Sequence, residues 1–173
     1  MIRAKDAVAV ARSLIGTPYS EMDCIALIRA VIKRAEGGDT VYRCEGTNWL
    51  WRSIGNSGKY RHLTWRQEGI QGACAGMLAF KRNGEDVHHV GLVTECGTVI
   101  HASSAYGRVV ETPLDDTWPL LGRHRYIEVQ EQGDVPGAVQ DDGGHPTGQA
   151  STLLVSEEGQ KLRLFGSWHV AGD

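Results

Sequence analysis

One cysteine and two histidines have the residue types and the placement that nucleophilic catalysis needs. Cys24 stands where a helical pattern of apolar residues begins, a stripe that also includes Leu27 and Ile28. The free N–H groups and the positive dipole end at a helix start favour a thiolate, so we expect a lowered pKa for this cysteine. A thiolate also needs a general base, and His89 and His101 lie on segments with the period of strands. The alternative is that Cys24 is a buried member of its apolar stripe.

The turn between the two histidine-bearing strands decides whether their rings can meet. Strand side chains alternate between faces, so the parity of the loop sets the face that each ring takes. A three-residue loop at 95–97 makes His89 and His101 diagonal neighbours on one face, whereas a two-residue loop puts them on opposite faces. We therefore predict a three-residue loop with Gly97 in the left-handed conformation, and both rings facing the helix of Cys24.

The elements that must position these residues are helices first and strands afterwards. Apolar spacing predicts a helix at 4–15 and a second one from Cys24 to Ala35, with Ser20 and Asp23 resembling a capping box and Gly37-Gly38 ending it. From about residue 76 the period changes to two, which predicts strands at 77–81, 89–94, 98–102, 108–112 and 123–129. This order favours an α+β fold, with N-terminal helices packed on a mainly antiparallel sheet. The segment between the helices and the strands, 39–72, is expected to be irregular and is rich in aromatic residues.

Length and composition limit the classes to which the protein can belong. A chain of 173 residues suits one domain with a small appendage, and a net charge of −3 disfavours a protein that binds nucleic acid through its phosphates. Gln, Asp, Gly and Pro at 131–150 predict a linker between a catalytic domain at 1–130 and a short β tail at 151–173. We find no apolar run long enough for a membrane span and no signal peptide at the first residues.

Three motifs in the right order resemble the NlpC-type cell-wall peptidases, which are papain-like cysteine peptidases that cut peptidoglycan stem peptides. Gly16-Thr17-Pro18-Tyr19 and Met22-Asp23-Cys24-Ile25-Ala26-Leu27-Ile28 are similar to the nucleophile segment of that family. His89-Val90-Gly91-Leu92-Val93 and Val99-Ile100-His101-Ala102-Ser103 are similar to its two histidine strands. The resemblance covers residues 4 to about 128. It departs from the family pattern at Ile25-Ala26, where a Ser-Gly pair is usual, and this affects specificity more than catalysis.

The resemblance implies a papain-like fold and a role for each residue that matches a motif. Cys24 would be the nucleophile, His89 the general base and His101 the residue that orients His89 through its second ring nitrogen. Tyr19 and Asp23 would contact substrate, with Asp23 at its free amino end. The backbone N–H of Cys24 would stabilise the oxyanion.

Several other side chains could take part in binding or in a different chemistry. Trp49 and Trp51, with Trp65, could line a groove for a sugar or a stem peptide, or could instead pack the irregular segment. His88 should point away from its neighbour His89 on a strand. The remaining histidines have no partner pattern and are expected to be structural or on the surface: His62, His124, His145 and His169.

The sequence thus predicts a cysteine hydrolase of peptidoglycan stem peptides that cuts between γ-D-glutamate and the following diamino acid. It would need no metal and no organic cofactor, and its partner would be peptidoglycan or its peptide fragments. It would act at the bacterial cell wall without a signal peptide, as a phage or prophage lysin would, and the tail could belong to a small wall-binding module. The alternatives are an N-acetylmuramoyl-L-alanine amidase, a non-catalytic wall-binding module on the same fold, and a zinc hydrolase that uses His88 and His101, although no HExxH-like spacing supports zinc.

Overall fold

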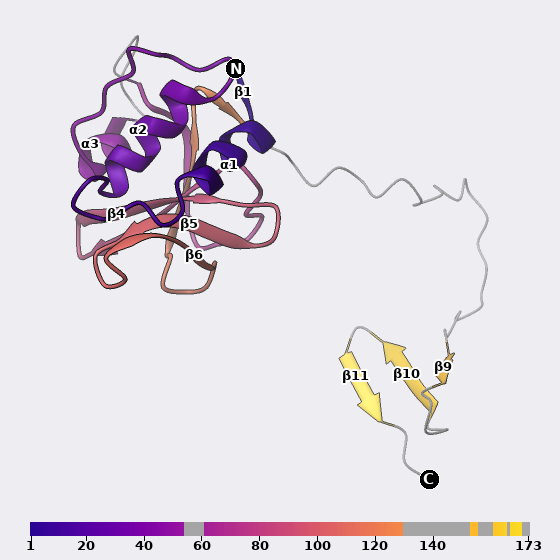
Figure 1. Ribbon diagram of the computed structural model, residues 1–173. Coiled ribbons are helices and arrows are strands. Elements are labelled where there is room, and N and C mark those ends of the chain that lie inside the picture. Colours follow the sequence, from indigo (N-terminus) through magenta and orange to yellow (C-terminus); the bar gives the residue numbers. More distant parts are fainter. Residues whose placement is uncertain (54–60, 130–152, 156–160, 166, 171–173) are drawn as a thin grey trace. The chain divides into compact units, whose positions relative to one another are not determined.

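The computed structural model describes residues 1–53, 61–129, 153–155, 161–165 and 167–170 (Figure 1). The chain divides into two compact units, Met1–Val135 and Pro136–Asp173. The predicted linker at 131–150 lies outside the described residues. Among the described residues, no helix combines the length and the apolar character that crossing a membrane requires.

The first unit begins with helices, as the apolar spacing predicts. Its described helices are α1 (Ala4–Ser13), α2 (Cys24–Arg34) and α3 (Thr47–Arg52). The N-cap of α2 is Asp23, whose Oδ1 accepts the backbone N–H of Ala26 at 2.7 Å. The expected box that begins at Ser20 is wrong, because the carboxylate of Asp23 already satisfies a free donor of the first turn.

A six-stranded antiparallel sheet follows, in the order β2-β7-β3-β4-β5-β6. Its strands are β2 (Leu63–Glu68), β3 (Leu78–Asn83), β4 (Asp86–Val93), β5 (Thr98–Ser103), β6 (Arg108–Pro113) and β7 (Leu120–His124). The predicted strand at 123–129 is divided, since a turn at 125–126 separates β7 from β8 (Ile127–Glu128), and β8 pairs in parallel with β1 (Ile2–Arg3). The α+β fold class with a mainly antiparallel sheet is confirmed.

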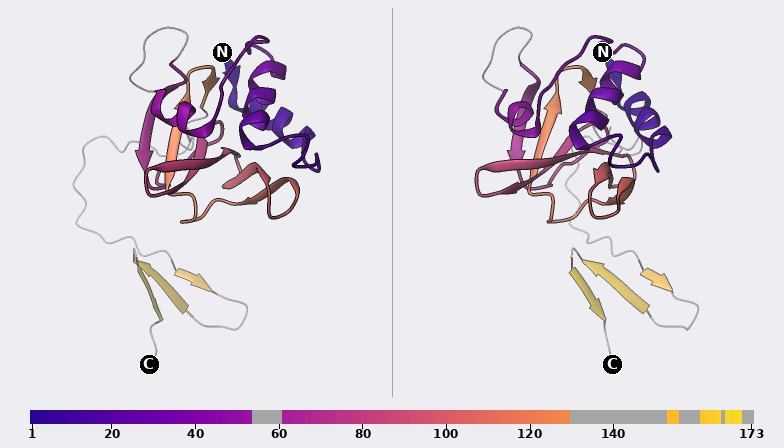
Figure 2. Two further views of the ribbon diagram at one scale, coloured as in Figure 1. Left: turned by 90° about the vertical axis from the view of Figure 1, so that its left-hand side faces the viewer. Right: turned by 60° about the vertical axis from the view of Figure 1, so that its left-hand side comes forward.

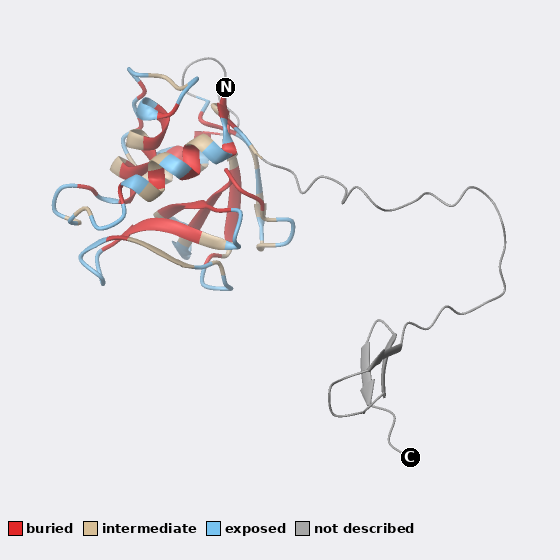
Figure 3. Ribbon diagram, turned by 45° about the vertical axis from the view of Figure 1, so that its right-hand side comes forward, coloured by how far each residue is buried: buried red, intermediate tan, exposed pale blue. Residues whose placement is uncertain are grey.

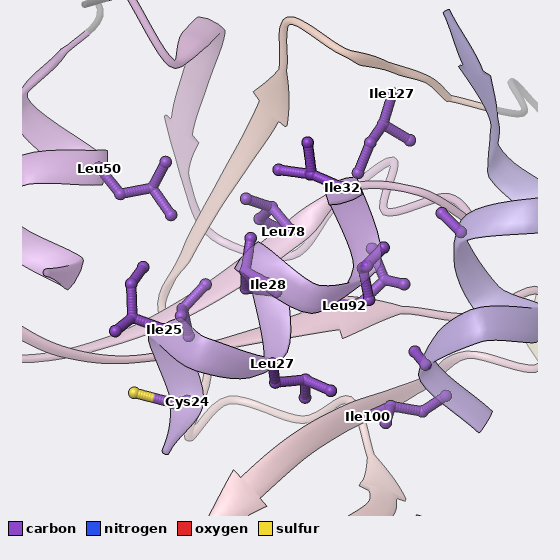
Figure 4. Packing of buried hydrophobic residues seen from close by; sticks show 14 of the residues in the cluster. Cys24, Ile25, Leu27, Ile28, Ile32, Leu50, Leu78, Leu92, Ile100 and Ile127 are labelled. Carbon is purple, nitrogen blue, oxygen red and sulfur yellow. The ribbon is translucent and has the colours of Figure 1, made fainter. Parts of the chain in front are cut away.

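The helices cover one face of this sheet (Figures 1 and 2). The apolar stripe of α2 packs against alternate side chains of the central strands, so that the buried residues form a continuous layer between helices and sheet (Figure 3). Figure 4 shows this layer, with Ile28 of α2 among Leu78, Leu92 and Ile100 of the sheet. The other face carries a smaller cluster that is built around Trp118. Cys24 therefore begins a helix that is held firmly on the sheet.

The second unit has three described strands. They are β9 (Leu153–Val155), β10 (Lys161–Phe165) and β11 (Ser167–Val170), and they form an antiparallel sheet in the order β11-β10-β9.

Candidate active site

The hairpin of β4 and β5 has the predicted register. Leu92 pairs with Ile100 and Val93 with Val99, which centres the hairpin on residue 96. Gly97 has a φ of 69° in the loop, the left-handed conformation that glycine adopts without steric cost. The predicted three-residue loop and its left-handed glycine are therefore confirmed.

This register brings the two histidine rings together. Nε2 of His89 lies 2.9 Å from Nδ1 of His101, and the ring centroids are 5.0 Å apart in an edge-on arrangement. Nε2 of His101 lies 3.1 Å from Oγ1 of Thr112 on β6. The three groups form a chain of hydrogen bonds across the sheet, and Nδ1 of His89 has no hydrogen-bond partner within residues 1–53 and 61–129.

A β-bulge precedes the histidine pair. Lys81 of β3 pairs with His89, while the next residue, Arg82, pairs with Val87, so His88 is an extra residue in β4. Bulges bend a strand locally and re-aim side chains, and they recur beside active sites. His88 is exposed and His89 is half-buried, and it is His89 that meets His101.

The two rings lie on the sheet face opposite the helix layer, so the expectation that they face the helix of Cys24 is wrong. Val90 and Leu92 of β4 belong to the helix-side core, and His89 alternates with Val90 along the strand. The indole of Trp118 lies 5.5 Å from the ring of His89 and 5.0 Å from that of His101. Trp118 thus covers the pair and shields its hydrogen bond from water.

The thiol of Cys24 reaches this region at the first turn of α2. Its sulfur interacts with the backbone N–H of Val90, the residue after His89, and with the N–H groups of Cys24 itself and Ile25. Burial nevertheless raises the pKa of Cys24, and the carboxylate of Asp23 raises it further. The expected lowering of this pKa is wrong, because loss of hydration outweighs the N–H groups at the helix start.

The histidine pair is held in its neutral form. The pKa of His89 is lowered to about 4, first by burial and then by the nearby charges of His101 and Lys81. The pKa of His101 is also lowered to about 4, by burial and by Lys81. At neutral pH the resting groups are thus a thiol and two neutral imidazoles.

A glycine lets the two strands approach closely at this point. A Cβ on Gly91 would lie 2.4 Å from Cγ1 of Val99 and 3.0 Å from Cβ of His101. Any side chain at residue 91 would push β5 away from β4 and lengthen the bond between the two histidines.

The other residues that the sequence singles out take different places. Burial and the charges of Cys24 and Asp23 raise the pKa of Tyr19, which places its hydroxyl near the thiol. Trp49 and Trp51 are not brought together. Trp49 is 46% exposed and lines a cavity of about 380 Å³, whereas Trp51 packs edge-on against Phe80 with ring centroids 5.1 Å apart.

A second cluster of histidines lies beside the cavity that Trp49 lines. The hydroxyl of Tyr42 is 2.9 Å from Nδ1 of His62 and 2.9 Å from Nε2 of His124. Trp49 donates its indole N–H to Nε2 of His62 at 3.1 Å, and the backbone N–H of Tyr126 donates to Nδ1 of His124 at 3.2 Å. We name these five residues the Tyr42 cluster.

The donors around the Tyr42 cluster fix its protons. Because each histidine accepts at one ring nitrogen, each carries its proton on the other and donates it to Tyr42. The hydroxyl of Tyr42 then gives its own proton to the sulfur of Cys44, with which it is hydrogen-bonded. His62, His124 and Tyr42 are at most 4% exposed, so this is a buried network with every ring nitrogen used. The expected structural role is confirmed for these two histidines.

Three residues of the candidate site carry no sequence signal that would have singled them out. Thr112 is one of many threonines on strands, and Trp118 and Lys81 lie outside the motifs. The pairing of β3 with β4 brings Lys81 to His89, the pairing of β5 with β6 brings Thr112 near His101, and Trp118 comes from the segment between β6 and β7. Among the described residues, no group of three His, Cys, Asp or Glu side chains could hold a metal ion.

No protein-family model matches the sequence, and no curated protein matches it. Among solved structures, the chain is similar to the NlpC/p60 domain of the peptidoglycan hydrolase SagA, with 24% identity and a TM-score of 0.49, over 69% of this chain and 97% of that one. It is also similar to the peptidoglycan hydrolase RipB from Mycobacterium tuberculosis, with 20% identity and a TM-score of 0.49, over 69% of this chain and 63% of that one.

Proposed function

We propose that this protein is a cysteine hydrolase of peptidoglycan stem peptides, with Cys24 as nucleophile, His89 as general base and His101 as the residue that orients the base. The observation that carries the proposal is the bond between Nε2 of His89 and Nδ1 of His101, which leaves Nδ1 of His89 without a hydrogen-bond partner among the described residues, while the sulfur of Cys24 interacts with the backbone N–H of the next residue, Val90. The motifs that carry these residues are those that resemble the NlpC-type peptidases.

The proton positions support the role of His89 as base. When Nε2 of His89 donates to Nδ1 of His101, His101 carries its own proton on Nε2 and donates it to the hydroxyl of Thr112. Nδ1 of His89 is then a free acceptor, as proton abstraction from a thiol requires. The hydroxyl of Thr112 can accept this proton, so the network is compatible with the tautomer that the base requires.

The reaction is an acyl transfer in two steps. The sulfur of Cys24 attacks the scissile carbonyl as its proton passes to His89, and the imidazolium then protonates the leaving amine. Water, deprotonated by His89, releases the acyl group from the sulfur. Asp23 caps the N–H of Ala26, so the N–H groups of Cys24 and Ile25 remain near the sulfur, where they can donate to the oxyanion.

We further propose that the bond cut joins γ-D-glutamate to the diamino acid. Tyr19 and Asp23 lie next to the nucleophile, and the charge of Asp23 suits the free amino group of an N-terminal L-alanine. The acyl portion of the substrate would then bind on the side of α2, and the leaving amino acid on the side of His89.

A turnover assay on defined stem peptides tests this function. The purified protein should convert L-Ala-γ-D-Glu-diamino acid peptides into the dipeptide and a new amino group, detected by mass spectrometry, and chelator should not change the rate. Cys24→Ala should abolish cleavage, while Cys96→Ala, which alters an exposed thiol, should not. Release of the intact peptide from muramic acid would indicate an amidase instead. Cleavage by Cys24→Ala at the wild-type rate would exclude the cysteine mechanism.

A further inference from the structure

The cavity that Trp49 lines lies outside the candidate active site and has no role in the proposed reaction. Its volume is about 380 Å³, and Cys24, His89 and His101 are not among its lining residues. Its walls come from residues between 39 and 49, from His62 and from the turn at 125–126. Sites for small ligands are concave and largely apolar, with a few polar groups around them, and they begin at about 300 Å³. The cavity is therefore large enough for a ligand.

Trp49 gives this cavity a flat apolar wall that is open to a ligand. Its indole N–H is donated to Nε2 of His62 at 3.1 Å, which fixes the ring, and the residue is still 46% exposed. The other three tryptophans of the first unit each have a cation over the ring, namely Arg66 over Trp51, Arg123 over Trp65 and Lys81 over Trp118. Within residues 1–53 and 61–129, no cation and no second aromatic ring stacks on Trp49.

The charged residues around the cavity are balanced in sign. Arg43 and Glu45 line it, and Asp39 and Arg125 add one further charge of each sign. Arg43 and Glu45 are exposed, and neither has an ion pair or a side-chain hydrogen bond within the described residues. An ionic ligand would be attracted by one of them and repelled by the other, whereas a hydroxyl can accept from a guanidinium and donate to a carboxylate. The cavity thus suits a neutral ring with an apolar face and hydroxyls at its rim, as a pyranose sugar has.

The walls of the cavity are attached to the elements that carry the nucleophile and the base. The carbonyl of Cys44 accepts a hydrogen bond from Arg29 of α2 at 2.9 Å. Next to Trp49, the side-chain oxygen of Asn48 accepts the backbone N–H of Val87 on β4 at 3.0 Å. A polymer that binds in the cavity is therefore held by the same framework that positions the reacting groups.

We propose that this cavity binds a sugar ring of the glycan strand, stacked on Trp49 and hydrogen-bonded by Arg43 and Glu45. That the sugar is an N-acetylated hexosamine rests on the proposed function, because the glycan of peptidoglycan is built from such sugars. The protein then holds its polymer at two places, with the stem peptide at the nucleophile and the glycan at Trp49. Glycan-linked stem peptides are therefore better substrates than free ones.

Calorimetric titration with triacetylchitotriose, a soluble chain of three N-acetylglucosamine rings, tests the site directly. The wild-type protein should bind this sugar, and Trp49→Ala should weaken binding at least about fivefold, the range of one aromatic contact. Trp49→Phe keeps a flat face and should retain most of the affinity. Tyr106→Ala removes a ring that is 65% exposed and does not line the cavity, so it should leave binding unchanged.

Two further variants keep the proposal testable if loss of the indole disturbs the fold. Arg43→Gln and Glu45→Gln change exposed side chains, and each should weaken binding of triacetylchitotriose several-fold. No binding to the wild-type protein, or equal binding by the wild type and all three variants of the cavity, would overturn the proposal. Displacement of the sugar by a free stem peptide would make the cavity a peptide site and would overturn it as well.

A kinetic comparison keeps this proposal separate from the proposed function. The ratio of kcat/KM for a glycan-linked stem peptide to that for the free peptide should exceed one in the wild type, fall towards one in Trp49→Ala and stay the same in Tyr106→Ala. If neither substrate is cleaved, the hydrolase fails, and sugar binding alone decides on the cavity. If both are cleaved and triacetylchitotriose does not bind, the cavity fails and the hydrolase stands.

Discussion

His62 and His124 form one pair of histidines, and His89 and His101 form another. The two pairs differ in whether every ring nitrogen has a hydrogen-bond partner. In the Tyr42 cluster, both rings have a partner at each nitrogen and both histidines are almost fully buried. In the pair of His89 and His101, the second nitrogen of His89 stays open, and its ring is only half-buried. A closed network stabilises the fold, whereas an open nitrogen can accept a proton during a reaction.

The two pairs also show why a lowered pKa alone does not identify a catalytic histidine. His124 has the lower value, about 3, and burial is its first cause, as it is for His89 at about 4. What distinguishes His89 is geometry, because among the four histidines of these two pairs only its ring keeps a nitrogen without a hydrogen-bond partner among the described residues. Changes at the open pair should therefore reduce turnover, whereas changes at the closed pair should reduce stability.

The largest effect should come from His89→Ala. Loss of the base should reduce kcat/KM on stem peptides by about 10²–10⁴, the range for general acid–base catalysis, with little change in the urea midpoint of unfolding. A variant that loses stability but keeps its turnover per folded molecule would show that His89 is structural, like His124.

The reverse pattern is expected for Tyr42→Phe. Without the hydroxyl, the N–H groups of His62 and His124 lose their acceptor in the core, which should cost about 2–4 kcal/mol of the free energy of unfolding. Denaturant titration measures this loss, and turnover per folded molecule should persist. Tyr106→Phe is the control, because Tyr106 is 65% exposed. Equal stability of both variants would refute the closed network.

A smaller effect on turnover is expected for His101→Ala, roughly ten- to a hundredfold, as for other groups that orient a functional side chain through a hydrogen bond. His101→Asn should recover part of the loss, because an amide oxygen can accept the proton on Nε2 of His89. Steady-state kinetics would decide, and a loss as large as that of His89→Ala, without any recovery by Asn, would argue against a purely orienting role.

The smallest difference between the two histidine pairs is expected when the pH is lowered. A buried histidine with a pKa of about 3 binds its proton only in the unfolded chain between pH 6.5 and 3, so stability falls as pH falls through that window. His124 alone should contribute about 1.4 kcal/mol to the loss at pH 5.5, and His89 and His101, whose pKa values are lowered to about 4, add to this loss. Turnover of the folded protein should persist at that pH and decline only towards pH 4, as His89 becomes protonated. A turnover midpoint near 6.5 would contradict a base that is already neutral at pH 5.5.

Local patterns were enough to predict much of the candidate site. The helix that starts at Cys24, the hairpin parity and the contact between the two histidines all follow from spacing within short segments, and the structure bears them out. The face of the rings and the pKa of Cys24 were predicted wrongly, because each depends on what packs around the residue. Burial and the covering Trp118 are tertiary facts that no local pattern contains.

The fold shows the same division between local and long-range information. Strand β2 was missed because its burial alternates among polar residues, and only its pairing with β7 makes it a strand. The Tyr42 cluster joins residues 42, 62 and 124, which come from three distant segments. Neither histidine of that cluster has a neighbour in sequence that would reveal its partner.

The parallel pairing of β1 with β8 has a consequence for protein engineering. Ile2 lies opposite Ile127 and Arg3 opposite Glu128, so the first strand and the last strand of this unit leave it at one edge. A short loop could join these strands, and new ends could be opened at the exposed turn at 104–106 without cutting a helix or a strand. The turn at 104–106 follows the β4–β5 hairpin in the chain. A permutant opened there would therefore keep Cys24, His89 and the whole hairpin on one continuous stretch of chain.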